Sequence, residues 1–396
     1  MQTSANAISH LSSSFNFQTV PRLVCEIGGA QKIGALVSEQ FGDTSHALIV
    51  TDPGFLKTGL VDSLIVNLRE HKMKVSVYSD VVADPPEAIV LQAVESARRD
   101  KIDLVIGVGG GSSMDVAKLI AVLLGSDQEL KSMYGIGNVK GTRLPLIQIP
   151  TTAGTGSEVT PISIVTTGAT TKMGVVSPQL YADLAILDAS LTVGLPSKVT
   201  AATGIDAMVH AIEAYTTKLK KNPLSDMLAR QALSLLSANL VLACEDGKNL
   251  AARQAMLLGA MLAGQSFANA PCAAVHALAY PIGGIFHVPH GLSNSLVLPH
   301  VLRFNSPEAA PLYAELAEIV SPGIQGSVEA KSQGLIDHMV QLANRVGIET
   351  QLRQVGITVN DLNRLADDAM MQTRLLTNNP RTVTRDDARA IYAAAL

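Results

Sequence analysis

The sequence predicts an α/β N-terminal domain with a mostly parallel sheet, followed by an all-α C-terminal domain. Up to about Leu191, short β-branched runs alternate with amphipathic stretches, which is typical of a doubly wound sheet. From Pro196 onward, long segments rich in Ala, Leu and Met follow one another with helical periodicity. We therefore expect a flexible tail at residues 1–20, a first domain at 21–191 and a second at 192–396.

Individual elements follow from the same patterns. The predicted strands of the parallel sheet are 47–51 (ALIVT), 75–78 (VSVY), 104–108 (LVIGV), 146–149 (LIQI) and 185–187 (AIL). Segment 159–176 differs, because its Thr, Val and Ile residues cluster around a TGATT turn, and it predicts a hairpin attached to that sheet. The predicted helices of the second half are 200–217, 224–243, 250–269, 309–319, 334–346 and 385–395.

Composition narrows the classes of function and partner. The chain has 396 residues, a net charge of −4, no Trp and 4% aromatic residues, so we expect no nucleic-acid partner. No uninterrupted apolar run approaches the roughly 20 residues that cross a bilayer, and the N-terminus lacks a signal-peptide core, so we expect a soluble protein with no membrane partner. Cys25, Cys244 and Cys272 are widely spaced, which fits a reducing compartment and a cytoplasmic location.

A glycine-rich turn, GGGSSMD, follows the third predicted strand and precedes a predicted helix. Gly109, Gly110 and Gly111 let backbone N–H groups approach an anion closely, and Ser112 or Ser113 can cap the helix. These features suit the pyrophosphate of a dinucleotide. The spacing is not GxGxxG and the loop does not follow the first strand, so a turn that serves packing alone is the alternative.

Two further segments suit a dinucleotide. Asp52 directly follows a predicted strand, where a carboxylate can accept from a ribose 2′-OH and would repel a 2′-phosphate, which favours NAD over NADP. An Asp that only opens a turn before Pro53 is the alternative. The segment PTTAGTGSE at residues 150–158 combines hydroxyls and glycines that suit a polar ligand, or forms only a flexible loop.

A second set of residues has the chemistry of metal ligands. Asp206 and His210 are four apart in a predicted helix and share one face, although such a pair is also a common local hydrogen bond or ion pair. The apolar segment AVHALAYPIGGIFHVPHG adds His276, His287 and His290. His276 and His290 complete a set of three imidazoles and one carboxylate that suits Fe(II) or Zn(II), whereas His287 can be a satisfied core histidine.

Taken together and in order, GGGSSMD, PTTAGTGSEVT, TGIDAMVHAIEAY and HALAYPIGGIFHVPHG resemble the iron-containing, or group III metal-dependent, alcohol dehydrogenases. The resemblance runs from about Pro21 to Leu396. It implies a dinucleotide-binding N-terminal domain and a helical C-terminal domain that carries the metal. It also implies a homodimer or higher homo-oligomer that transfers a hydride between NAD(P) and a small alcohol or aldehyde.

The resemblance also assigns site residues. The implied metal ligands are Asp206, His210, His276 and His290. The implied metal is Fe(II), with Zn(II) as the alternative. The implied cofactor contacts are Asp52, Asp84, Gly109, Gly110, Gly111, Ser112, Ser113, Thr151, Thr152 and Lys172.

One position departs from the family pattern. Many members have a second histidine four residues after the first in the HALAYPIGGIFHVPHG motif, and this chain has Tyr280 there. A phenol one turn beyond His276 can donate or relay a proton, although its ordinary pKa of about 10 means that relay requires help. Lining the cofactor pocket is the alternative for Tyr280, and His287 is the other candidate relay.

Two other functions fit parts of the sequence. A metal-dependent lyase of the dehydroquinate synthase type also uses NAD, but it needs a basic pocket for a phosphorylated substrate. The histidine cluster contains no other basic residue. A non-catalytic sensor of dinucleotide or metal would not need both a complete ligand set and a complete glycine loop. Dehydrogenation therefore remains the favoured function, with the substrate and the physiological direction open.

Overall fold

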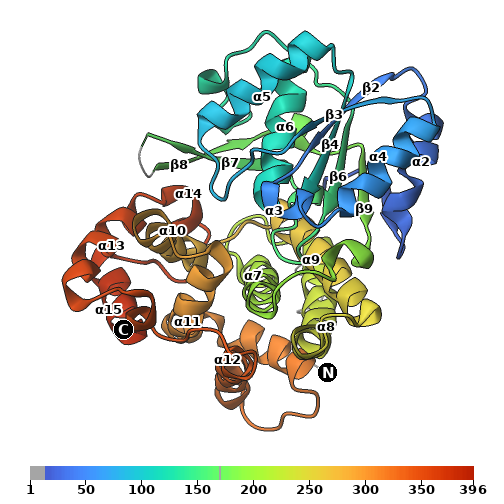
Figure 1. Cartoon of the computed structure of the whole chain (residues 1–396). Coiled ribbons are helices and arrows are strands. Elements are labelled where there is room, and N and C mark those ends of the chain that lie inside the picture. The colour runs from blue at the N-terminus through green and yellow to red at the C-terminus, as the bar shows by residue number, and fades with distance from the viewer. Residues whose placement is uncertain (1–13, 169–170) are drawn as a thin grey trace. The chain divides into compact units, whose positions relative to one another are not determined.

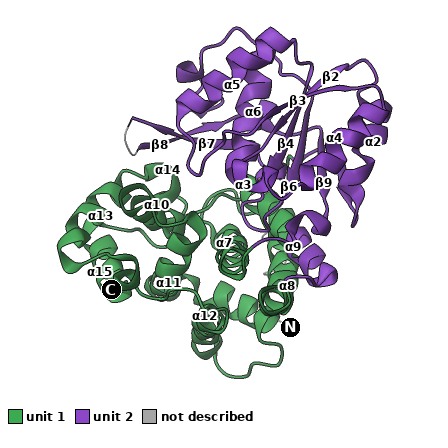
Figure 2. Cartoon of the chain, in the orientation of Figure 1, with its two compact units in different colours: residues 1–18, 196–246, 259–396 green, residues 19–195, 247–258 purple. Residues whose placement is uncertain are grey.

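The computed structural model describes residues 14–168 and 171–396, which form two compact units. Unit 2, purple in Figure 2, comprises residues 19–195 and 247–258, and unit 1, green, comprises the other described residues. The structure therefore differs from the prediction of two contiguous domains, because residues 247–258 belong to unit 2. The predicted tail falls largely outside the described residues, but Gln18 exchanges two backbone hydrogen bonds of 2.8 Å with the Asn269 side chain.

The main sheet of unit 2 has six parallel strands in the order β1-β9-β6-β4-β2-β3 (Figure 1). These strands are β1 (Leu23–Cys25), β2 (His46–Val50), β3 (Lys74–Tyr78), β4 (Leu104–Gly109), β6 (Leu146–Pro150) and β9 (Leu184–Leu187). The five predicted strands are all present, which confirms the mostly parallel sheet. The three residues of β1 are too few to show a period in the sequence.

Helices of unit 2 cover both faces of this sheet. They are α2 (Ile33–Gln40), α3 (Pro53–Leu56), α4 (Leu60–Glu70), α5 (Glu87–Asp100) and α6 (Gly111–Gly125). Leu104 and Ile106 of β4 join the core cluster that contains Leu64 and Leu68 of α4. The next residue, Gly107, faces α6, where an added Cβ would lie 2.9 Å from the Ala117 Cβ. Because both faces are covered, β4 is buried along its whole length.

The predicted hairpin forms, but in a different sheet. β7 (Ile162–Thr167) and β8 (Thr171–Val176) pair antiparallel, and β8 also pairs with the short β5 (Gly135–Ile136). The expectation that the hairpin joins the main sheet is therefore wrong. β7 is instead bound to α6, because Ile164 N–H donates to the Asp115 carboxylate at 2.8 Å.

Unit 1 confirms the predicted all-α class, since its described residues contain no strand. Its helices are α7 (Ser197–Thr216), α8 (Pro223–Glu245), α10 (Ala274–Phe286), α11 (His290–Val320), α12 (Val328–Arg345), α13 (Leu362–Met370), α14 (Thr373–Leu376) and α15 (Arg385–Ala395), while α9 (Leu250–Asn269) begins in unit 2 and continues into unit 1. α7 is buried almost throughout and packs against α8 and α11. Polar side chains on α7 therefore lie inside the unit.

The sequence prediction contains no helix in place of α10 and covers only residues 309–319 of α11. Pro281 lies inside α10, and Pro299, Pro307 and Pro311 lie inside α11. A proline removes one backbone donor and normally ends a helix, so Pro281 hid α10, and Pro299 and Pro307 hid the part of α11 before residue 309. Tertiary packing holds the helices continuous.

Among the described residues, α8 is one helix whose length and composition would allow it to cross a membrane. Its 18-residue window has a mean hydropathy of 1.4, and 33% of that window is buried inside the protein. Core helices pass the same test, and α8 packs against both α7 and α11. The helix is therefore weak evidence for a membrane segment.

The start of α6 lies very close to the loop after β6, and a substitution can test this close approach. An added Cβ on Gly111 would lie 2.8 Å from the Thr155 Cγ2, whereas one on Gly110 would make an ordinary contact of 3.6 Å with Thr152. We expect Gly111→Ala to lower the free energy of unfolding by about 1–3 kcal/mol through overpacking. Gly110→Ala is the matched control and should change it by less than about 0.5 kcal/mol. Equal losses in urea-induced unfolding would contradict the close approach.

Candidate functional site

The glycine turn joins β4 to α6 in unit 2. Gly109 has φ 153°, and an added Cβ there would lie 2.6 Å from the Ser113 Oγ, so this position requires glycine. Gly110 is the N-cap of α6 and no side chain caps the helix, which corrects the expectation that Ser112 or Ser113 would do so. The first N–H groups of a helix lack intrahelical partners, so this end is suited to an anion.

Asp52 opens a turn, as one of its two interpretations predicts. It is the N-cap of α3, and its Oδ1 accepts a hydrogen bond of 2.9 Å from Phe55 N–H. Its Oδ2 is 3.5 Å from the position that a Cβ on Gly109 would occupy. The carboxylate therefore opens a turn and also stands beside the glycine turn.

The other predicted dinucleotide contacts fall into two groups. Thr151 N–H donates to Gly109 O at 2.9 Å, and Thr152 lies against Gly110, so these two residues join the glycine turn. Asp84 and Lys172 form a separate ion pair of 2.6 Å. Asp84 has φ 50°, which is uncommon for a residue with a side chain.

A buried charge network joins α6 to the residues after β6, and it was not predicted. Lys118 of α6 is completely buried, lies 3.6 Å from Asp115, and donates to the Ser157 Oγ at 2.7 Å. Burial lowers the pKa of Lys118 and raises that of Asp115. Burial also raises the pKa of Glu158 to about 7. The sequence signal was a lysine three residues after Asp115 within an apolar helix, where a charge needs buried partners.

The predicted metal ligands lie together in unit 1. Asp206 and His210 come from α7, His276 from α10, and His290 is the first residue of α11. One donor atom from each of these four residues lies within 4.8 Å of the others. Asp206, His210 and His276 are buried, whereas the His290 side chain is 32% exposed, so the cluster is open on the side of His290.

Acceptor atoms converge inside this cluster. The Asn294 Nδ2 donates to the Asp206 Oδ1 at 2.6 Å and lies 3.3 Å from the Nε2 atoms of both His276 and His290. Burial raises the pKa of Asp206, but the neighbouring imidazoles, led by His210, outweigh this effect and keep it below its usual value. Ionised carboxylate oxygen and imidazole nitrogen around one point are the donor set of a divalent Fe or Zn site, so the residues fit the metal.

Glu213 supports the cluster and was missed in the sequence. Its Oε2 is 2.6 Å from the His276 Nδ1, and its Oε1 accepts from Val275 N–H at 2.7 Å. A carboxylate on Nδ1 places the proton there and leaves the Nε2 lone pair available to a metal. The available signal was the position of Glu213, three residues after His210 on the same helix.

The candidate proton relays differ in placement. Tyr280 is one turn after His276, and its ring centroid is 5.8 Å from that of His290. His287 lies outside the four-residue cluster: it is exposed, with φ 57°, at the C-terminal end of α10. Phe267 stacks on His210 with ring centroids 4.3 Å apart, so it packs against the cluster.

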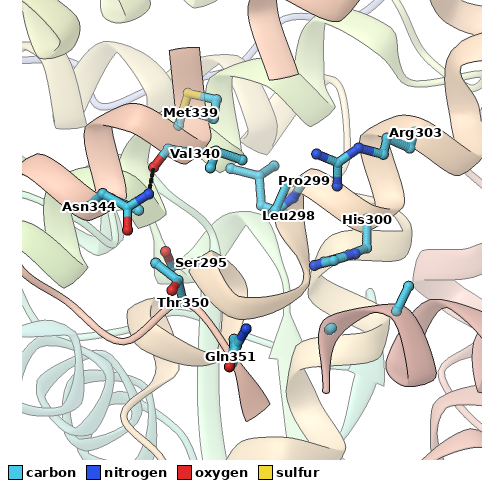
Figure 3. A pocket seen from close by; sticks show the side chains of 13 residues that line it. Ser295, Leu298, Pro299, His300, Arg303, Met339, Val340, Asn344, Thr350 and Gln351 are labelled. Atoms are coloured by element: carbon cyan, nitrogen blue, oxygen red, sulfur yellow. Dashed lines mark hydrogen bonds between the residues drawn. The ribbon is translucent and has the colours of Figure 1, made fainter. Parts of the chain in front are cut away.

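A separate cavity of about 230 Å³ in unit 1 involves none of the predicted site residues. Figure 3 shows His300 and Arg303 of α11 and Met339 of α12 on its walls. Burial and the positive charge of Arg303 lower the pKa of His300 to about 4, so this imidazole is neutral. The cavity is thus distinct from the metal cluster.

Two family models match this chain in succession. The model described as "Iron-containing alcohol dehydrogenase" matches residues 21–189, and "Fe-containing alcohol dehydrogenase family, C-terminal" matches residues 200–396. The chain belongs to the iron-containing alcohol dehydrogenases. This confirms the predicted family and the predicted function of a metal-dependent alcohol dehydrogenase or aldehyde reductase, and favours it over the lyase and the sensor.

Individual relatives of this iron-containing alcohol dehydrogenase agree with the family. The chain is 44% identical to long-chain-alcohol dehydrogenase 1 of Geobacillus thermodenitrificans over 355 residues, which cover 88% of this chain and 89% of the relative. The crystal structure of a 1,3-propanediol oxidoreductase matches 97% of this chain and 100% of its own, with 33% identity and a TM-score of 0.93. A sulfoacetaldehyde reductase from Bifidobacterium kashiwanohense, solved with NAD+, matches 97% and 99%, with 28% identity and a TM-score of 0.87.

The support that Glu213 gives to His276 can be measured as metal affinity. We expect Glu213→Gln to weaken Zn²⁺ binding by about 10–100-fold, because the amide no longer fixes the imidazole as a carboxylate does. Competition with a chromophoric chelator measures the Kd. Glu318→Gln is the matched control, since Glu318 is an exposed glutamate of α11 paired with Lys331. Unchanged affinity in Glu213→Gln would contradict the assigned role.

Proposed function

We propose that this chain transfers a hydride between NAD and a small alcohol or aldehyde whose oxygen is held at a divalent metal site formed by Asp206, His210, His276 and His290. The observation that carries the proposal is that one donor atom from each of these four residues lies within 4.8 Å of the others. When bound, Fe(II) or Zn(II) supplies Lewis acidity toward the substrate oxygen. In the reducing direction, an aldehyde gains a hydride from NADH and a proton.

The residues around the cluster have separate parts in this proposal. His290 is the partly exposed ligand, so the substrate approaches on its side. Tyr280, beside His290, is the candidate proton donor in preference to the exposed His287. Burial raises the pKa of Tyr280, so the phenol keeps its proton at neutral pH and can donate it.

Unit 2 supplies the proposed dinucleotide site. The N-terminal end of α6 suits the pyrophosphate, and the Asp52 carboxylate beside Gly109 supports NAD over NADP. Gly109, Gly110, Gly111, Ser112, Ser113, Thr151 and Thr152 are the proposed contacts around it, with the Asp84–Lys172 pair as a second group.

The proposal also includes a cytoplasmic homodimer. No disulfide joins Cys25, Cys244 and Cys272, which all lie in the described part of the chain, and this supports a reducing compartment. The exposed Leu224, Met227 and Leu242 side chains of α8, together with the low fraction of charged residues, support a contact with a second copy.

Absorbance of NADH tests this function directly. Purified apoprotein is assayed anaerobically with NAD(H), short alcohols or aldehydes, and Fe(II), Zn(II) or no metal. We expect turnover that depends on metal and falls at least about 1,000-fold in His276→Ala, because the metal site loses a ligand. His71→Gln, an exposed histidine of unit 2, is the control and should retain activity within twofold. Turnover without metal, or full activity in His276→Ala, would contradict the proposal.

A further inference from the structure

Lys118 carries a charged side chain that is completely buried in unit 2. Its ammonium group donates to the Ser157 Oγ at 2.7 Å, to the Thr160 Oγ1 at 3.3 Å and to Ile162 O at 2.7 Å. A lysine has three N–H donors, so each of them has an acceptor here. All three acceptors lie between the end of β6 and the first residue of β7. The buried ammonium group therefore fixes this connecting segment against α6.

Asp115 binds the same segment from three residues earlier on α6. Its Oδ1 accepts from the Ser157 Oγ at 2.6 Å, and its Oδ2 accepts from Ile164 N–H at 2.8 Å. The buried Ser157 hydroxyl thus donates to Asp115 and accepts from Lys118. One hydroxyl joins the connecting segment to both charged side chains.

Ser157 is also the last residue of loop 151–157, which follows β6 and borders the glycine turn. At the start of this loop, Thr151 N–H donates to Gly109 O at 2.9 Å. At its end, Ser157 N–H donates to the Thr155 Oγ1 at 3.3 Å. The Thr155 Cγ2 lies 2.8 Å from the position of a Cβ on Gly111. Ser157 therefore binds α6 through its side chain, while its backbone holds the threonine that lies against the start of that helix.

These buried charges determine geometry more than stability. A buried ion pair often stabilises a fold no better than apolar side chains of similar volume. Its hydrogen bonds are directional, however, and they fix the segments that they join. The loop fixed here includes Thr151 and Thr152, which are proposed dinucleotide contacts. A site that is ordered before its ligand arrives binds more tightly, because binding then costs less conformational entropy.

We propose that Ser157, held between Asp115 and Lys118, is a positioning residue that sets the affinity of unit 2 for the dinucleotide by holding loop 151–157 against the start of α6. This inference rests on the proposed function, because it concerns the proposed dinucleotide site. Without the Ser157 hydroxyl, the loop loses its link to both charges, and the dinucleotide must order the loop as it binds.

Titration of the Zn²⁺-loaded protein with NADH, followed by NADH fluorescence, tests this role. We expect Ser157→Ala to raise the Kd of NADH at least about tenfold, which corresponds to about 1.4 kcal/mol. Lys118→Met, which removes the donor on α6, should raise it at least as much. The Kd of Zn²⁺, measured by chelator competition, should stay within about twofold in Ser157→Ala, because the metal ligands lie in unit 1 and the two sites share no partner.

Ser163→Ala is the matched control. Ser163 of β7 is also completely buried, and its hydroxyl donates to Asp115 O at 2.9 Å. Each variant loses one buried serine hydroxyl bonded to Asp115, so both should unfold at lower urea concentrations than the wild type. Only Ser157 belongs to loop 151–157, so Ser163→Ala should keep the Kd of NADH within about twofold of the wild type. An equal rise in both variants, or no rise in Ser157→Ala, would overturn the proposal.

Turnover adds a readout that general structural damage would not reproduce. With the aldehyde that the wild type reduces fastest, Ser157→Ala should raise the KM for NADH at least about tenfold, while kcat at saturating NADH stays within about threefold. A fall in kcat with an unchanged KM would contradict the positioning role. Failure of the proposed function would appear in the wild type itself, as absence of NADH binding and of turnover with every aldehyde, and would overturn this inference with it.

Discussion

Asp206 is an ionised carboxylate buried inside a helical unit, and an isolated charge there would be costly. Its oxygen is surrounded by the Asn294 amide and by the imidazoles of His276 and His290, at 2.6, 3.9 and 3.7 Å. Helices α7, α10 and α11 must meet at this point for the cluster to exist. The Glu213 contact extends the same requirement to the far side of His276. One buried charge thus links the packing of the helical unit to its chemistry.

The sequence predicted the sheet well because each strand is short, apolar and bounded by turns. It predicted α7 and α9 for a similar reason, since neither contains an internal proline. It missed α10 and the part of α11 before residue 309, where Pro281, Pro299 and Pro307 lie inside continuous helices. Packing against neighbouring helices decides these cases, and single-sequence patterns do not contain that information. The hairpin was found, but its partner strand β5 has only two residues and leaves no pattern.

The candidate site was predictable where chemistry is concentrated in rare residue types. Histidines among apolar residues and a cluster of glycines stand out in a sequence, so the four-residue metal cluster and the glycine turn were found. Glu213, Asn294 and Lys118 were missed, because each acts through a partner distant in sequence: 63 residues separate Glu213 from His276, and 88 separate Asn294 from Asp206. Such roles become visible only when the fold is known.

The central claim is that Asp206, His210, His276 and His290 hold the metal, and not the neighbouring group of Glu213, Cys272 and His276. X-ray absorption spectroscopy of the Zn²⁺-loaded protein distinguishes the two groups most directly. The account predicts a first shell of nitrogen and oxygen only, at about 2.0–2.2 Å, with the scattering pattern of several imidazoles. A sulfur neighbour at about 2.3 Å would place the metal at Cys272 and contradict the account.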